Sequence, residues 1–123
     1  SLTPSRQREW KKNNPDKDVW VIGVDKDQSS EGEISGTDMN VTLTSMVKRV
    51  DLAVQQVSTD AKDGKFPGGK TVEFGLKEDG VDISPTTDNL TDEMIQAVND
   101  YKDKIKNGEI KVPSTQEELD AFL

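Results

Sequence analysis

The sequence predicts an α/β fold in which a parallel sheet is flanked by helices. A near-continuous run of β-branched and aromatic residues, from Asp18 to Asp25, is typical of a strand buried on both faces, as in a parallel sheet covered by helices. Two later segments carry apolar residues at helical spacing, so helices and strands alternate along the chain. The 123 residues suffice for one core of ordinary size or for part of a larger one.

In the first half, a helix, the buried strand and an amphipathic helix are expected in that order. Thr3, Pro4 and Ser5 form a helix start, because Pro fits the first helical position, and residues 13–16 end this helix. Residues 26–40 are polar and rich in Gly and Ser, which predicts a loop, and a short extended piece follows over 40–43. From Thr44 onward a helix with one buried face is predicted by apolar residues at gaps of three and four, namely Val47, Val50, Val54, Val57 and Ala61.

The second half is expected to contain a strand and two helices. Residues 62–64, Lys-Asp-Gly, end the amphipathic helix, and residues 71–74 alternate as a half-buried strand. A long helix begins near Thr91, has acidic residues in its first turn and ends by Gly108. Residues 114–117, Ser-Thr-Gln-Glu, match a capping box for a last short helix.

The composition excludes several classes of function. The chain has no His and no Cys, so it cannot supply a Ser-His-Asp or Cys-His catalytic pair, a zinc site made of these ligands, or a disulfide. Its net charge of −8 opposes binding to nucleic acid or to anionic lipid. Since the remaining carboxylates and lysines form no evident catalytic pair, we expect no enzyme activity and no cofactor.

Two sequence motifs resemble known sites but fail on their context. Residues 64–71 match the phosphate loop G-x-x-x-x-G-K-[ST], yet a helix enters this segment, a strand is predicted to leave it, and Pro67 lacks an amide hydrogen. Residues 25–36 open like a calcium loop, but Ser30 stands at the sixth position and Gly36 at the twelfth. We therefore expect neither a nucleoside triphosphate site nor a metal site here.

Asp25 and Lys48 are the candidate ligand-binding residues that the pattern itself suggests. Asp25 ends the most buried strand, which we expect to be central in the sheet, and open α/β sheets bind ligands beyond the carboxyl ends of their strands. A carboxylate there can accept hydrogen bonds from two hydroxyl groups, although a turn aspartate fits the same position. Lys48 is expected in the first turn of the amphipathic helix. There it either donates hydrogen bonds at the rim of a pocket or lies in solvent beside the buried face of the helix.

Four blocks of the sequence resemble the C-terminal portion of the basic membrane lipoproteins. This family comprises substrate-binding lipoproteins of bacterial ABC importers, including purine nucleoside receptors. The blocks follow one another with compatible spacing: residues 19–28 (VWVIGVDKDQ), 43–51 (LTSMVKRVD), 72–82 (VEFGL with GVD after it) and 104–113 (KIKNGEIKVP).

The resemblance implies a periplasmic-binding-protein fold of the ribose-binding kind, with two α/β lobes and a nucleoside, expected to be a purine nucleoside, in the cleft between them. Residues 1–123 would be a fragment that contributes to both lobes. Asp25 and Lys48 would then contact ribose hydroxyls, and Asp27, in the same block as Asp25, would be a third ligand contact. Gln28 also belongs to this block. The implied location is the outer face of the bacterial membrane, through a lipid anchor absent from this chain, or the periplasm.

The implied partners are a nucleoside and the membrane subunits of an ABC importer. Because the resemblance implies a crossover between lobes after Asp25, the strand ending there and the helix carrying Lys48 are expected in different lobes. Strand edges and the valine stripe would then stay partly uncovered, so we expect pairing with an N-terminal fragment of the same protein or with a second copy. The alternative is a small acidic protein-interaction or regulatory domain that uses the fold without a ligand.

Overall fold

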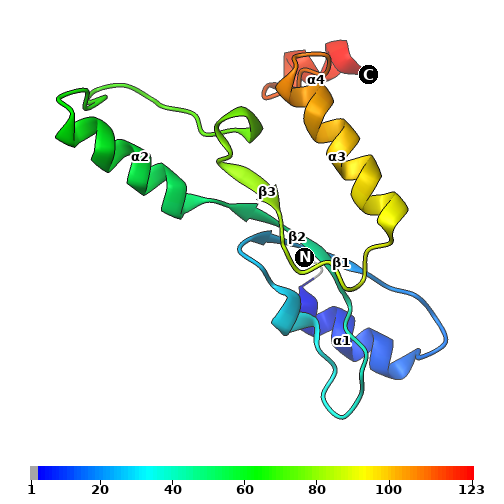
Figure 1. Ribbon diagram of the computed structural model, residues 1–123. Coiled ribbons are helices and arrows are strands. Elements are labelled where there is room, and N and C mark those ends of the chain that lie inside the picture. The colour runs from blue at the N-terminus through cyan, green and yellow to red at the C-terminus, as the bar shows by residue number, and fades with distance from the viewer. Residues whose placement is uncertain (1–2) are drawn as a thin grey trace. The chain divides into compact units, whose positions relative to one another are not determined.

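The computed structural model describes residues 3–123, which form two compact units. The first unit ends at Thr91 and the second runs from Asp92 to Leu123. Figure 1 follows the elements of both units. The helices are α1 (Pro4–Asn13), η1 (Ser29–Gly32), α2 (Val50–Lys62), η2 (Leu76–Glu78), α3 (Asp92–Lys106) and α4 (Gln116–Phe122), and the strands are β1 (Val21–Asp25), β2 (Thr42–Lys48) and β3 (Val81–Ile83).

The sheet of the first unit has the strand order β1-β2-β3. β1 and β2 are parallel, with Asp25 opposite Val47, and β3 runs antiparallel to β2, with Val81 opposite Lys48. The mixed α/β class is therefore confirmed. The prediction that the strand ending at Asp25 is central is wrong for this sheet, because β2 pairs on both sides whereas β1 pairs with β2 alone among the described strands.

Residues 42–48 form a strand where the valine spacing predicts an extended piece followed by a helix. The β-branched residues Thr42, Thr44 and Val47 suit a strand, and neighbours on both sides satisfy its backbone. The helix begins only at Val50, so Lys48 ends a strand and does not lie in a helical turn. It consequently shares one sheet with Asp25, and the predicted separation of these two residues by a crossover is wrong.

Residues 71–74 are irregular, whereas their alternation predicts a strand. A short strand needs a neighbour to satisfy its backbone, and the place antiparallel to β2 is taken by Val81–Ile83 instead. The first long helix does end where Lys62, Asp63 and Gly64 predict it. Residues 64–71 thus follow a helix and precede irregular chain, which is not the strand-to-helix context of a phosphate loop.

The core of the first unit is small and partly polar. Val21, Ile34 and Val41 are the buried apolar residues among those described, and they are joined by the buried polar residues Gln7, Thr42, Ser45 and Ser84. The predicted burial of β1 on both faces is wrong, since Ile22 is 61% exposed and Val24 is 51% exposed.

Helix α2 has the predicted amphipathic pattern but lacks a packed apolar face. Val50 and Val54 are 62% and 60% exposed, and α2 contains no buried residue. The expectation that the valine stripe stays partly uncovered is therefore confirmed in this chain.

The helices α1, α3 and α4 confirm the sequence-based boundaries to within one or two residues. In the second unit, the N-cap of α4 is Thr115, whose Oγ1 accepts a hydrogen bond from the Glu118 backbone N–H at 3.1 Å. The carboxylate of Glu118 accepts hydrogen bonds from the N–H and hydroxyl of Ser114. The predicted cap therefore lies one residue further along the chain, with Thr115 as the N-cap in place of Ser114.

Candidate functional site

Asp25 and Lys48 lie side by side at the carboxyl edge of the parallel strand pair. Each is the last residue of its strand, and parallel strands end at the same edge of a sheet. The Lys48 Nζ atom lies 2.7 Å from Oδ1 of Asp25. The structure thus brings together the two residues that the sequence suggests as ligand contacts.

The backbone of Asp25 adopts an unusual conformation for a residue with a side chain. Its φ angle is +76°, in the left-handed region that favours glycine and tolerates Asp and Asn. Unfavourable backbone conformations of this kind cluster at sites where a side chain must take a defined direction. Here the conformation ends β1 abruptly and leaves the carboxylate near Lys48.

The ion pair itself contributes little to folding. The side chains of Lys48 and Asp25 are 56% and 65% exposed, so water screens their attraction. Exposed pairs of this kind stabilise a fold by about 0–1 kcal/mol. The Asp25 carboxylate can, however, accept a hydrogen bond from one hydroxyl group, while the Lys48 ammonium group beside it donates to another.

Asp27 joins two segments that lie far apart in the sequence. Its Oδ1 accepts a hydrogen bond from the Ser29 backbone N–H at 2.9 Å, and its Oδ2 accepts one from the Thr86 hydroxyl at 2.7 Å. The Thr86 hydroxyl first and the Ser29 N–H second lower the pKa of Asp27 from 3.8 to about 2. Both carboxylate oxygens therefore serve contacts within the protein.

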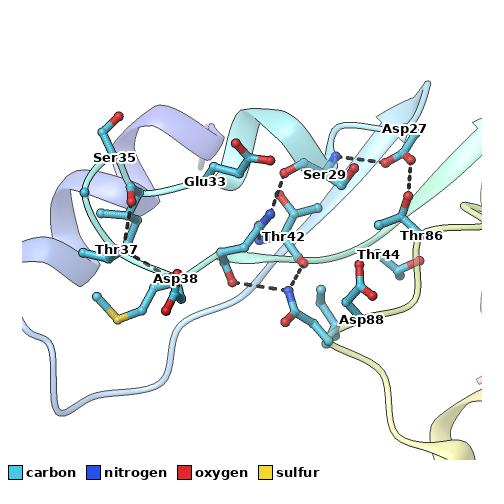
Figure 2. A pocket seen from close by; sticks show the side chains of 16 residues that line it. Asp27, Ser29, Glu33, Ser35, Thr37, Asp38, Thr42, Thr44, Thr86 and Asp88 are labelled. Atoms are coloured by element: carbon cyan, nitrogen blue, oxygen red, sulfur yellow. Dashed lines mark hydrogen bonds between the residues drawn. The ribbon is translucent and has the colours of Figure 1, made fainter.

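A polar cavity of about 470 Å³ opens beside Asp27, and Figure 2 shows its lining. Neither Asp25 nor Lys48 lines it. The lining residues are Asp27, Ser29, Glu33, Ile34, Ser35, Gly36, Thr37, Asp38, Met39, Asn40, Thr42, Leu43, Thr44, Thr86, Asp88 and Asn89.

Much of the polar lining of this cavity is hydrogen-bonded within the protein. The Asn89 side chain donates to the backbone oxygens of Asn40 and Thr42, and the Asn40 side chain donates to that of Ser29 (Figure 2). The buried Thr44 Oγ1 has no hydrogen-bond partner among residues 3–123. Sequence reasoning missed the role of Thr86, because no local pattern indicates a contact between residues 59 positions apart.

The described residues contain no cluster of three His, Cys, Asp or Glu side chains able to hold a metal ion. Nor does any helix within residues 3–123 combine the length and the apolar character needed to cross a membrane.

The carboxylate and the ammonium group lie at the carboxyl edge of parallel strands, the edge at which the ligand-binding class of α/β proteins holds its ligands. The comparisons agree with this class: the family described as "ABC transporter substrate-binding protein PnrA-like" matches residues 5–116. The chain belongs to this family, also called Bmp, and the membership predicted from its sequence blocks is confirmed. The family consists of substrate-binding proteins and not of enzymes.

The relatives include proteins from three bacterial genera. The "CD4+ T-cell-stimulating antigen" of Listeria monocytogenes is 51% identical over 106 residues, 84% of this chain and 30% of the relative. The "ABC transporter nucleoside-binding protein BmpA" of Lactococcus lactis is 46% identical over 106 residues, 84% of this chain and 29% of the relative. "Basic membrane protein C" of Borreliella burgdorferi is 32% identical over 104 residues, 84% of this chain and 28% of the relative. The chain spans about 30% of the length of these relatives.

Proposed function

We propose that this chain supplies the sugar-binding part of a nucleoside receptor that serves an ABC importer. In this proposal residues 1–123 are the C-terminal portion of a two-lobed periplasmic-binding-protein fold of the ribose-binding kind. The ligand is a nucleoside, with a purine base favoured by the sequence resemblance, and it lies in the cleft between the lobes. The observation that carries the proposal is the contact between Asp25 and Lys48 at the carboxyl edge of β1 and β2.

The chemistry of this pair suits a vicinal diol. The Asp25 carboxylate can accept a hydrogen bond from each of two neighbouring hydroxyl groups, and Lys48 can donate to a hydroxyl oxygen. Because the pair is exposed to solvent in this chain, a ligand can approach it without first unfolding a core. The relative from Lactococcus lactis carries nucleoside binding in its name, which favours ribose as the diol.

Asp27 has a supporting role in this proposal. Its carboxylate holds Thr86 and Ser29, so it shapes the loop that follows Asp25 and is not itself a contact to the ligand. This assignment changes the expectation from the sequence, in which Asp27 was a third ligand contact.

The partners in this proposal are the membrane subunits of the importer. A receptor of this kind delivers its ligand from the outer face of the bacterial membrane, held there by a lipid anchor, or from the periplasm. Binding favours the closed arrangement of the lobes through the higher affinity of that arrangement for the ligand.

Calorimetric titration of the full-length gene product with adenosine, guanosine and uridine tests the proposal. Each ribonucleoside is compared with its 2′-deoxy and 3′-deoxy forms, because a carboxylate that accepts both hydroxyl hydrogens loses a bond to either analogue. We expect each deoxy form to bind about tenfold or more weakly, the range for a hydrogen bond to a charged group. Equal affinity for all forms would contradict the role of Asp25, and absence of nucleoside binding would favour the protein-interaction alternative.

A further inference from the structure

The loop that follows Asp25 is closed by a side chain. Oε1 of Gln28 accepts a hydrogen bond at 2.9 Å from the backbone N–H of Val24, the residue before Asp25. The left-handed residue Asp25 therefore lies inside a short loop whose two ends, Val24 and Gln28, are joined to each other.

Gln28 also fastens this loop to the strand that carries Lys48. Its backbone N–H donates to Oγ of Ser45 at 3.0 Å, and its carbonyl oxygen accepts from the Thr42 hydroxyl at 3.2 Å. Ser45 and Thr42 belong to β2 and are buried, so these contacts connect the loop to a fixed part of the sheet. One residue thus joins the end of β1 to the strand that ends at Lys48.

Gly23 leaves the room that Gln28 occupies. A Cβ atom at Gly23 would lie 2.9 Å from both Cβ and Oε1 of Gln28, and 2.4 Å from Oγ of Ser45. Those distances are too short for any residue with a side chain. The close approach of Gln28 to β1 consequently depends on glycine at this position.

Both the oxygen and the nitrogen of the Gln28 amide make hydrogen bonds within the protein. Besides the bond to Val24, its Nε2 donates to Oε2 of Glu31 at 3.1 Å, and Glu31 is paired in turn with Lys26 at 3.1 Å. An amide held from both ends has a fixed orientation, which suits a structural contact better than a contact to a ligand.

We infer that Gln28 is a positioning residue that sets the direction of the Asp25 carboxylate toward Lys48 and toward the ligand hydroxyls. The inference rests on the proposed function and adds a specific cause for the backbone conformation of Asp25. Without the bond from Val24 to Gln28, the loop loses the contact that offsets the unfavourable φ of Asp25, and the carboxylate is free to turn away from Lys48.

Substitution of Gln28 in the full-length gene product tests this role. Gln28→Met keeps the length and bulk of the side chain but removes both amide hydrogen bonds. We expect it to weaken nucleoside binding about threefold to tenfold, as the loss of one ordinary hydrogen bond implies. Gln28→Glu keeps an acceptor for Val24 but would place a second carboxylate against Glu31, so it is combined with Glu31→Gln, which removes that repulsion. The double variant should restore part of the loss. Gln96→Ala, which removes an exposed amide from α3, is the matched control.

A double-mutant cycle with Asp25→Asn separates positioning from a general loss of stability. If Gln28 acts through Asp25, Gln28→Met weakens binding in the wild-type background and has no further effect in the Asp25→Asn background. Ile34→Val, a conservative change in the core, lowers stability without touching the loop and should leave the affinity unchanged in both backgrounds.

The outcomes distinguish this inference from the proposed function. If Asp25→Asn weakens binding but Gln28→Met does not, or if the Gln28→Met loss is the same in both backgrounds, the positioning role is wrong and the proposed site stands. If Asp25→Asn binds nucleosides like the wild type, both the proposed site and the positioning role are overturned.

Discussion

Oδ1 of Asp25 lies 2.7 Å from Nζ of Lys48, although the two residues end different strands and the helix η1 lies between them in the chain. Their closeness follows from the parallel register, which places Asp25 opposite Val47, the neighbour of Lys48.

Asp25→Asn should weaken nucleoside binding by roughly 1.5–3 kcal/mol, about tenfold to a hundredfold, because a charged acceptor becomes neutral. Asn is preferred to Ala in this test, since it tolerates the left-handed backbone. Asp79→Asn is the matched control, because Asp79 has a φ angle of +55° and lies outside the site. Titration calorimetry of the full-length gene product measures the effect, and wild-type affinity in Asp25→Asn would exclude this residue from the site.

Lys48→Gln should weaken nucleoside binding by a similar or smaller amount, since a neutral donor replaces a charged one. Its effect on the free energy of unfolding should stay within about 1 kcal/mol, because the pair with Asp25 is exposed. Lys62→Gln removes a charge from the last turn of α2 and serves as the control. A variant that loses stability but keeps its affinity would assign Lys48 to folding and not to the ligand.

The Asp27 carboxyl group should titrate with a pKa of about 2, and Thr86→Val should raise this pKa toward 3.8, because the Thr86 hydroxyl is the main cause of the shift. NMR titration of the side-chain carboxyl carbon measures both values, with Thr87→Val as the neighbouring control. The unfolded chain has the higher pKa, so as the pH falls it binds the proton first. The stability that ionised Asp27 contributes is thus complete above about pH 4 and lost between about pH 4 and pH 2. A wild-type midpoint near 3.8 would contradict the contact.

Gly23→Ala should destabilise the sheet by roughly 1–3 kcal/mol, the usual range for overpacking a well-filled site. The added methyl group meets Ser45 and Gln28 at distances that force one of them to move. Gly75→Ala should be tolerated, because its Cβ would approach Glu78 no closer than 3.5 Å. Denaturant unfolding of both variants checks the contrast, and equal stability would show that the loop beside Gly23 is loosely packed.

The isolated 123-residue chain should associate at micromolar concentration, because Ile22, Val24, Val50 and Val54 are all more than half exposed. Val50→Gln combined with Val54→Gln should reduce this association, whereas Ser58→Gln on the same helix should not. Analytical ultracentrifugation distinguishes the outcomes. A compact wild-type monomer with cooperative unfolding would show that these residues need no partner.

The helices could be predicted from the sequence because their signals are local. Pro4 at the start of α1, the acidic first turn of α3 and the cap at Thr115 all act within a few residues of the element they define. The signals that end α2 and α3 are equally local, because Gly64 and Gly108 follow these helices and both have a positive φ.

The strands were harder to predict because pairing decides them. Residues 42–48 become a strand through neighbours on both sides, and the helical spacing of Val47, Val50 and Val54 extends the predicted helix into it. Residues 71–74 alternate in hydropathy as a strand does, but none of the described strands pairs with them. The burial of Ser45 and Ser84 at the sheet likewise depends on tertiary contacts that no hydropathy pattern contains.

Asp25 could be identified from its place at the end of an apolar run, and the resemblance identified Lys48. The position of Lys48 in the fold, the contact of Asp27 with Thr86 and the closing bond from Val24 to Gln28 could not be predicted in the same way. Each of these depends on the register of β1 and β2 or on a loop that returns to the sheet.

The left-handed backbone of Asp25 gives position 25 an unusual mutational tolerance. Gly and Asn accept the same φ angle, so either can replace Asp there without disturbing the turn, whereas β-branched residues cannot. A single nucleotide change from an Asp codon reaches both Gly and Asn. Under the proposed function, one such change would weaken ligand binding while the fold is kept. In family comparisons the residue at this position should separate members that have retained the ancestral ligand from members that share only its architecture.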